Sequence, residues 1–115
     1  MINVVIKKNK ANQPYYFEVS GHAGYANLGN DIVCAAISVL TITVANSIEK
    51  NTSDEKKIMV NEKDATITIE MPTIRDNKAS AEIIVLANTL YQGIKDVDEE
   101  YEHKYISVKE ESYND

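Results

Sequence analysis

The chain contains a single cysteine, Cys34, and a histidine, His22, that precedes it by twelve residues. An imidazole can take the proton of a thiol, and the resulting thiolate is the nucleophile of many hydrolases and acyl transferases. The intervening segment is rich in glycine and long enough to fold back on itself. The spacing therefore predicts a Cys–His site, with Cys34 as nucleophile and His22 as its base.

Each of these two residues also has a purely structural interpretation. A lone cysteine is often an inert core residue, and a lone histidine is often held by structural hydrogen bonds. We expect Cys34, however, in the first turn of a helix whose N-cap is Asn30 or Asp31. Free backbone N–H groups and the helix dipole favour a thiolate there, whereas a free thiol has a pKa near ~8.5.

Three neighbours have candidate supporting roles. Asp31 either caps the helix by accepting the N–H of Cys34 or orients the ring of His22, and both roles stay open. Ser38, one turn after Cys34, either packs as a small residue or forms a hydrogen bond within the site. The backbone N–H groups near Val33 and Cys34 are candidate donors to an oxyanion.

The segment between His22 and the helix is predicted to be a loop that opens for a peptide and closes over the thiol. Simple turn formation by its glycines is the alternative. Its members are Gly24, Tyr25, Ala26, Asn27, Leu28 and Gly29. The second histidine, His103, follows an acidic run, and we expect it to be exposed to solvent.

Apolar patterning predicts the elements that must position these residues. Alternation indicates strands over 2–6, 15–19, 57–60, 66–71 and 105–109. Helices are expected from about residue 30 to 49 and from 79 to about 95. The order ββα-ββ-α-β predicts a single α+β domain over residues 1–115, with two helices on a mostly antiparallel sheet.

The first predicted helix is apolar over more than half of its circumference, so it must be buried on more than one side. The sheet accounts for one side, and the second helix or a partner chain accounts for the other. A homodimer is therefore a hypothesis. The apolar positions are Ile32, Val33, Ala36, Ile37, Val39, Leu40 and Val44.

Composition excludes several classes of protein. The net charge of the 115-residue chain is −6 and no basic cluster exceeds two residues, which argues against direct binding to nucleic acid. The cysteine and histidine spacing matches no metal motif, so we expect neither a metal nor a cofactor. No apolar run reaches the ~18 residues of a membrane span, and lysines follow the N-terminal apolar stretch instead of preceding it. We therefore expect no membrane association and a cytoplasmic protein.

The residues around the predicted site resemble the signature of a known family. Gly21-His22-Ala23-Gly24-Tyr25-Ala26, Gly29, Asp31-Ile32-Val33-Cys34-Ala35-Ala36 and Ser38 are similar to the motif of the ribosomal-processing cysteine protease Prp. The resemblance implies that His22 is the catalytic base and proton donor, that Cys34 is the nucleophile, and that Asp31 and Ser38 support them. It also implies that the loop from Gly24 to Gly29 covers the substrate.

The resemblance further implies a bacterial, cytoplasmic, homodimeric endopeptidase. Its substrate would be large-subunit ribosomal protein twenty-seven, from which it removes an N-terminal extension after an apolar, aromatic-containing segment. Two alternatives stay open on the sequence. One is a non-catalytic dimeric ribosome-assembly adaptor with a structural Cys34, and the other is a different thiol enzyme, such as an acyl transferase, with the same dyad.

Overall fold

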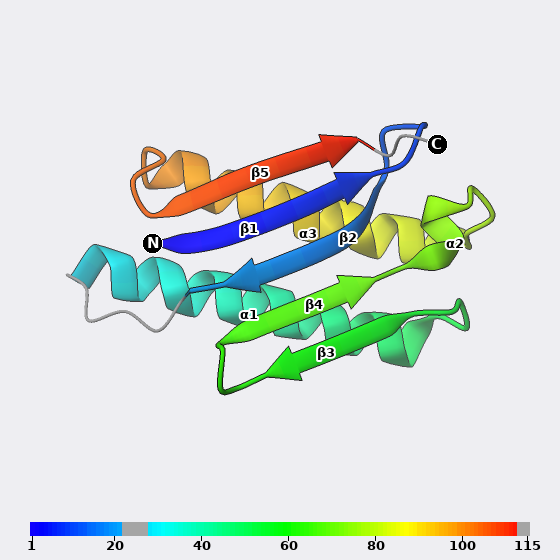
Figure 1. Ribbon diagram of the computed structural model, residues 1–115, viewed down its shortest axis with the longest axis horizontal. Helices are drawn as coiled ribbons and strands as arrows, with labels where there is room; N and C mark the ends of the chain where they lie inside the picture. The colour runs from blue at the N-terminus through cyan, green and yellow to red at the C-terminus, as the bar shows by residue number, and fades with distance from the viewer. Residues whose placement is uncertain (22–27, 113–115) are drawn as a thin grey trace.

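The computed structural model describes residues 1–21 and 28–112, with the backbone alone for residues 28–31. Within these ranges the chain forms five strands and three helices (Figure 1). The strands are β1 Ile2–Lys8, β2 Pro14–Ser20, β3 Lys57–Asn61, β4 Thr66–Glu70 and β5 Ile106–Ser112. The helices are α1 Leu28–Asn51, α2 Pro72–Arg75 and α3 Ala81–Glu100.

The strands make one sheet in the order β3-β4-β2-β1-β5. Three pairs are antiparallel, and β5 runs parallel to β1. The predicted α+β fold is thus confirmed, with one addition. Pro72, expected only to end the hairpin, also opens the short helix α2, because its fixed φ and missing N–H suit the first helical position.

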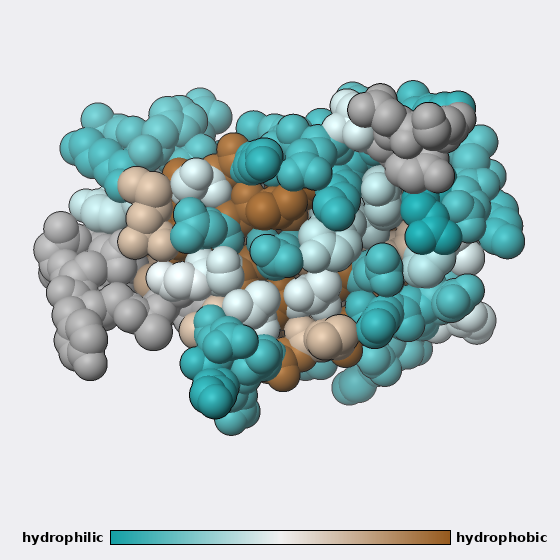
Figure 2. All heavy atoms as spheres, viewed as in Figure 1, coloured by the Kyte–Doolittle hydropathy of each residue, from teal (hydrophilic) through white to brown (hydrophobic). Residues whose placement is uncertain are grey.

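The core lies between the sheet and the two long helices, which cover one face of it (Figure 1). Alternate residues of each strand point toward the helices. One row of such residues crosses the sheet from Ile58 through Ile69 and Phe17 to Ile6, each paired with the next. The opposite face of the sheet is mostly hydrophilic or neutral (Figure 2), so the domain is a two-layer structure with a single core.

Helix α1 packs against both the sheet and α3. Its buried valines and isoleucines, Val33, Ile37, Val44 and Ile48, recur at helical spacing and point into the core. At Gly93 the two helices approach so closely that a Cβ there would overlap the side chain of Leu40. The expected burial of α1 on two sides is therefore confirmed.

We expected no segment apolar enough to cross a membrane, and by length and composition alone that prediction was wrong. Residues Ile32–Asn51 would pass such a test. The same residues supply the buried face of α1, and the core helix of a compact two-layer domain has this composition as well. About a third of this stretch is buried inside the domain, so packing accounts for part of its apolar character.

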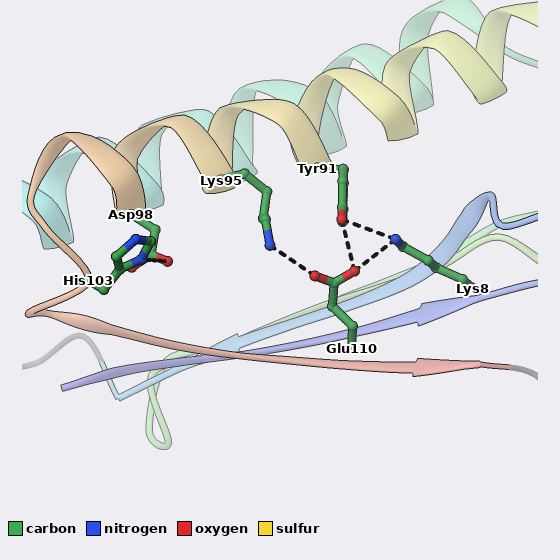
Figure 3. Close-up of polar contacts among 6 residues, drawn as sticks. All are labelled: Lys8, Tyr91, Lys95, Asp98, His103 and Glu110. Atoms are coloured by element: carbon green, nitrogen blue, oxygen red, sulfur yellow. Dashed lines mark hydrogen bonds and ion pairs between the residues drawn. The ribbon is translucent and has the colours of Figure 1, made fainter.

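A polar cluster joins α3 to the strands at the edge of the sheet (Figure 3). The carboxylate of Glu110 on β5 lies 2.8 Å from Lys8 Nζ and 3.0 Å from Lys95 Nζ, and it accepts a hydrogen bond of 2.8 Å from the hydroxyl of Tyr91. The hydrogen bond from Lys8 lowers the pKa of Glu110 most. Partial burial acts in the opposite direction, but the bonds from Lys95 and Tyr91 help bring the pKa to about 2 from an ordinary value of 4.5.

We predict that Glu110→Gln lowers the free energy of unfolding at pH 7 by about 1 kcal/mol, because it removes the charge that holds two lysines. The folded-state pKa lies below the unfolded one, so this stabilisation is present above pH 4.5 and is lost as the pH falls toward 2. Urea titrations from pH 7 to pH 2.5 measure the difference. Glu111→Gln, at the next residue of β5, is the control and should change stability by less than about 0.5 kcal/mol. A deficit for Glu110→Gln that stays constant over this pH range would contradict the account.

Candidate active site

Cys34 lies on α1 at the boundary of the core. The side chains of Val33 and Ile37 are fully buried, and Cys34 retains 9% exposure. The helix begins at Leu28, so Cys34 is its seventh residue and belongs to the second turn. The expected position in the first turn was therefore wrong, because the helix starts two to three residues earlier than its predicted cap.

This earlier start changes the roles of several neighbours. Asp31 is the fourth residue of α1, so it is not the N-cap, and its side chain lies outside the described residues. The backbone N–H groups of Val33 and Cys34 belong to the i→i−4 ladder of the helix. They are not free to bind an oxyanion, and the donors must come from elsewhere.

The predicted base and the predicted loop are largely outside the described residues. This holds for His22 and for residues 24–27, while Leu28 and Gly29 belong to α1 and not to a loop. The structure does describe the residue before His22. Gly21 adopts a φ of +79°, and a Cβ on it would lie 2.9 Å from the carbonyl oxygen of Met1. Glycine is therefore required where the chain leaves β2.

Ser38 continues the face of α1 that carries Cys34. It is half-buried and lies one turn further along the helix, where it lines a hollow together with Ile42 and the β3–β4 hairpin. Thr41, three residues further along α1, is fully buried and donates a 2.7 Å hydrogen bond to the carbonyl of Ile37. The polar side chains of Ser38 and Thr41 are therefore both at least partly enclosed.

His103 is 70% exposed, as predicted, but it has a partner that the sequence did not indicate. Its Nδ1 lies 2.8 Å from Oδ2 of Asp98, at the end of α3 (Figure 3). The carboxylate of Asp98 is buried, and its other oxygen has no hydrogen-bond partner among the described residues. A spacing of five residues across the end of a helix does not by itself predict this contact, because the contact needs left-handed backbone at Glu102 and His103.

The described residues contain no group of three His, Cys, Asp or Glu side chains that could hold a metal ion. The chemistry that this part of the molecule offers is that of a thiol on α1 at the boundary of the core.

Comparison with known proteins identifies the fold. The structure matches a ribosomal processing protease Prp of Staphylococcus aureus in complex with a substrate peptide, with a TM-score of 0.84 and 23% identity over 96% of this chain and all of the other. A second structure of the S. aureus protease, with a covalently linked product peptide, gives a TM-score of 0.80 at 24% identity over the same shares. A protein of Streptococcus mutans gives a TM-score of 0.83 at 25% identity over 98% of this chain and 99% of the other.

Sequence comparison gives the same result. The ribosomal processing cysteine protease Prp of Bacillus subtilis is 23% identical over 101 residues, which are 88% of this chain and 90% of the relative. The model of the cysteine protease Prp family matches residues 1–107. The fold and the match define a small α+β cysteine protease. The chain belongs to the Prp family of cysteine proteases, and this membership decides against the non-catalytic adaptor.

We predict that the thiol of Cys34 reacts with iodoacetamide in the folded protein at pH values well below 8, because a cysteine protease holds its nucleophile partly as thiolate. Labelling rates from pH 5 to 9, followed by intact mass, measure this. His22→Ala should move the midpoint of the rate profile to higher pH, and His103→Gln should leave it unchanged. A thiol that resists labelling until the chain is unfolded would contradict the prediction.

Proposed function

We propose that this chain removes the N-terminal extension of large-subunit ribosomal protein twenty-seven, with Cys34 as nucleophile and His22 as base. The observation that carries the proposal is the cysteine count. The chain belongs to a cysteine protease family and contains one cysteine, which supports Cys34 as the nucleophile. The match to the family signature from Gly21 to Ser38 supports His22 as its partner.

The proposed reaction passes through a thioester. His22 accepts the proton of Cys34, and the thiolate attacks the carbonyl carbon of the cleaved bond. The C–N bond then breaks as the imidazolium gives its proton to the leaving amine. A water molecule, deprotonated by His22, next attacks the thioester and releases the acid product and the thiol. Asp31, three residues before Cys34 and so on a similar side of the helix, is proposed to orient His22.

The acidic protein suits a basic substrate. Its net charge of −6 would attract a ribosomal protein electrostatically, with an effect on association that weakens as salt is added. We propose that the reaction takes place in the cytoplasm, as part of ribosome assembly, and that it needs no cofactor.

We predict that the purified protein cleaves a synthetic peptide that spans the extension junction. Cys34→Ala should lower kcat/KM at least about 10³-fold, because it removes the nucleophile, and His22→Ala should have a similar effect. His103→Gln is the matched control, since it changes the only other histidine, and it should stay within about twofold of the wild type. Product formation is followed by mass spectrometry. Unchanged cleavage by Cys34→Ala would rule out the mechanism.

We also propose that the protein is a homodimer joined through the outer side of its helical layer. Helix α1 leaves Ile32 and Val39 exposed, with Val39 at 66%, and α3 leaves Val85 exposed at 62%. Large apolar side chains exposed on one side of a small domain are typical of an interface between proteins. In such a dimer the partner chain would bury a further side of α1, in addition to the sides that face the sheet and α3.

We predict a molar mass of two chains in light scattering at micromolar concentration. Val39→Glu should give the mass of one chain, because a carboxylate would be buried in the interface without a partner. Met59→Glu is the control, since Met59 is similarly apolar and exposed but lies on the sheet, and it should remain a dimer. A wild-type chain that is monomeric at these concentrations would contradict the proposal.

A further inference from the structure

A hollow of about 380 Å³ lies between α1 and the tip of the β3–β4 hairpin. Its walls are mainly apolar, and Glu62 stands among the lining residues at the turn. The volume is within the ~300–1,000 Å³ of pockets that accept small ligands. Its apolar lining residues are Ile42, Val60, Ala65 and Ile67, and its polar ones beside Glu62 are Ser38, Asn61 and Thr66.

On the strand side, the apolar residues that line the hollow point to the same face of the sheet as the core residues. Val60 pairs with Ile67, and Ile67 pairs with Val19. Ile67 and Val19 are buried, but Val60, which points to the same face, is 61% exposed. The row of core residues therefore ends in an apolar side chain that no described element covers.

The wall on the helix side belongs to the face of α1 that carries the proposed nucleophile. Cys34, Ser38 and Ile42 follow one another at intervals of four residues and so share one side of the helix. With a rise of ~1.5 Å per residue, Ser38 and Ile42 lie ~6 and ~12 Å along the axis from Cys34. An extended peptide advances ~3.3 Å per residue, so the hollow is two to four residues from a bond held at Cys34.

We propose that this hollow is a specificity subsite, which receives an apolar side chain of the substrate two to four residues from the cleaved bond. The inference rests on the proposed function, because it takes the position of Cys34 as the position of the reaction. Ile42 and Val60 contact the substrate side chain from opposite walls. Burial of that side chain would give the selectivity, and the carboxylate of Glu62 at the rim would disfavour an acidic residue there.

The structure offers a matched pair of variants on β3. Val60→Asp places a carboxylate in the hollow, whereas Met59→Asp places one at the neighbouring residue, which is 52% exposed and points to the opposite face of the sheet. We predict that Val60→Asp lowers kcat/KM for the junction peptide about tenfold or more, because a carboxylate in the hollow disfavours the binding of an apolar side chain there. Met59→Asp should stay within about twofold of the wild type.

A lysine scan of the peptide, from four residues before the cleaved bond to four after it, then identifies the occupant. At one position two to four residues from the bond, lysine should reduce cleavage by the wild type. The loss of kcat/KM that this lysine causes should be about tenfold smaller for Val60→Asp than for the wild type. The reason is that the ammonium group of the peptide would pair with the carboxylate of the variant. Equal activities of Val60→Asp and Met59→Asp, or no compensation at any position in this window, would overturn the subsite.

Thermal unfolding would reveal whether Val60→Asp folds, and a second variant tests the proposal if it does not. Ile42→Gln, at a wall residue that is 44% exposed, should lower kcat/KM about fivefold or more for the original peptide. It should have no effect on a peptide with alanine at the occupying position, and an equal effect on both peptides overturns the proposal.

A wild-type chain that does not cleave overturns the proposed function and the subsite together. Cleavage that depends on Cys34 but not on Val60 or Ile42 overturns the subsite alone.

Discussion

The burial of one face of α1 against the sheet is the constraint on which the rest of the structure depends. Val33, Ile37 and Ile48 are fully buried, so the rotation of the helix about its axis is fixed by the core. Cys34 is one residue on from Val33 and therefore lies about 100° around the helix. The packing of the core thus decides that the thiol stands at the rim of the core, neither sealed within it nor fully in solvent.

The same sheet anchors the other half of the proposed site. Strand β2 lies between β4 and β1 and pairs with β1 up to Ser20. Gly21 follows with a positive φ, packed against the carbonyl of Met1. The chain therefore leaves the sheet toward His22 from a fixed point, at the same end of the molecule as the start of α1 (Figure 1). The helix that carries Cys34 and the strand that precedes His22 belong to one two-layer scaffold, and support of this kind is how a small domain can position two reacting groups.

Much of this arrangement was predictable because it follows local patterns. The strands, the two long helices and the α+β class follow from alternation and helical periodicity, and the family motif led to the prediction that Cys34 is the nucleophile. The start of α1 was not predictable, because Asn30 and Asp31 are such good caps that they concealed a helix beginning at Leu28. The contacts of His103 and Glu110 depend on residues brought together by the tertiary fold. The uncovered position of Val60 depends on where α1 crosses the sheet, which no local pattern encodes.

The central claim is that Cys34 forms a covalent bond with the substrate, and intact-mass analysis of an acid-quenched reaction tests it most directly. The account predicts an early species whose mass exceeds that of the protein by the N-terminal product of the peptide less one water. Fragmentation should place this added mass on Cys34. Cleavage that proceeds with the added mass on another residue, or with no such species under single-turnover conditions that capture the thioester of a known cysteine protease, would contradict the account.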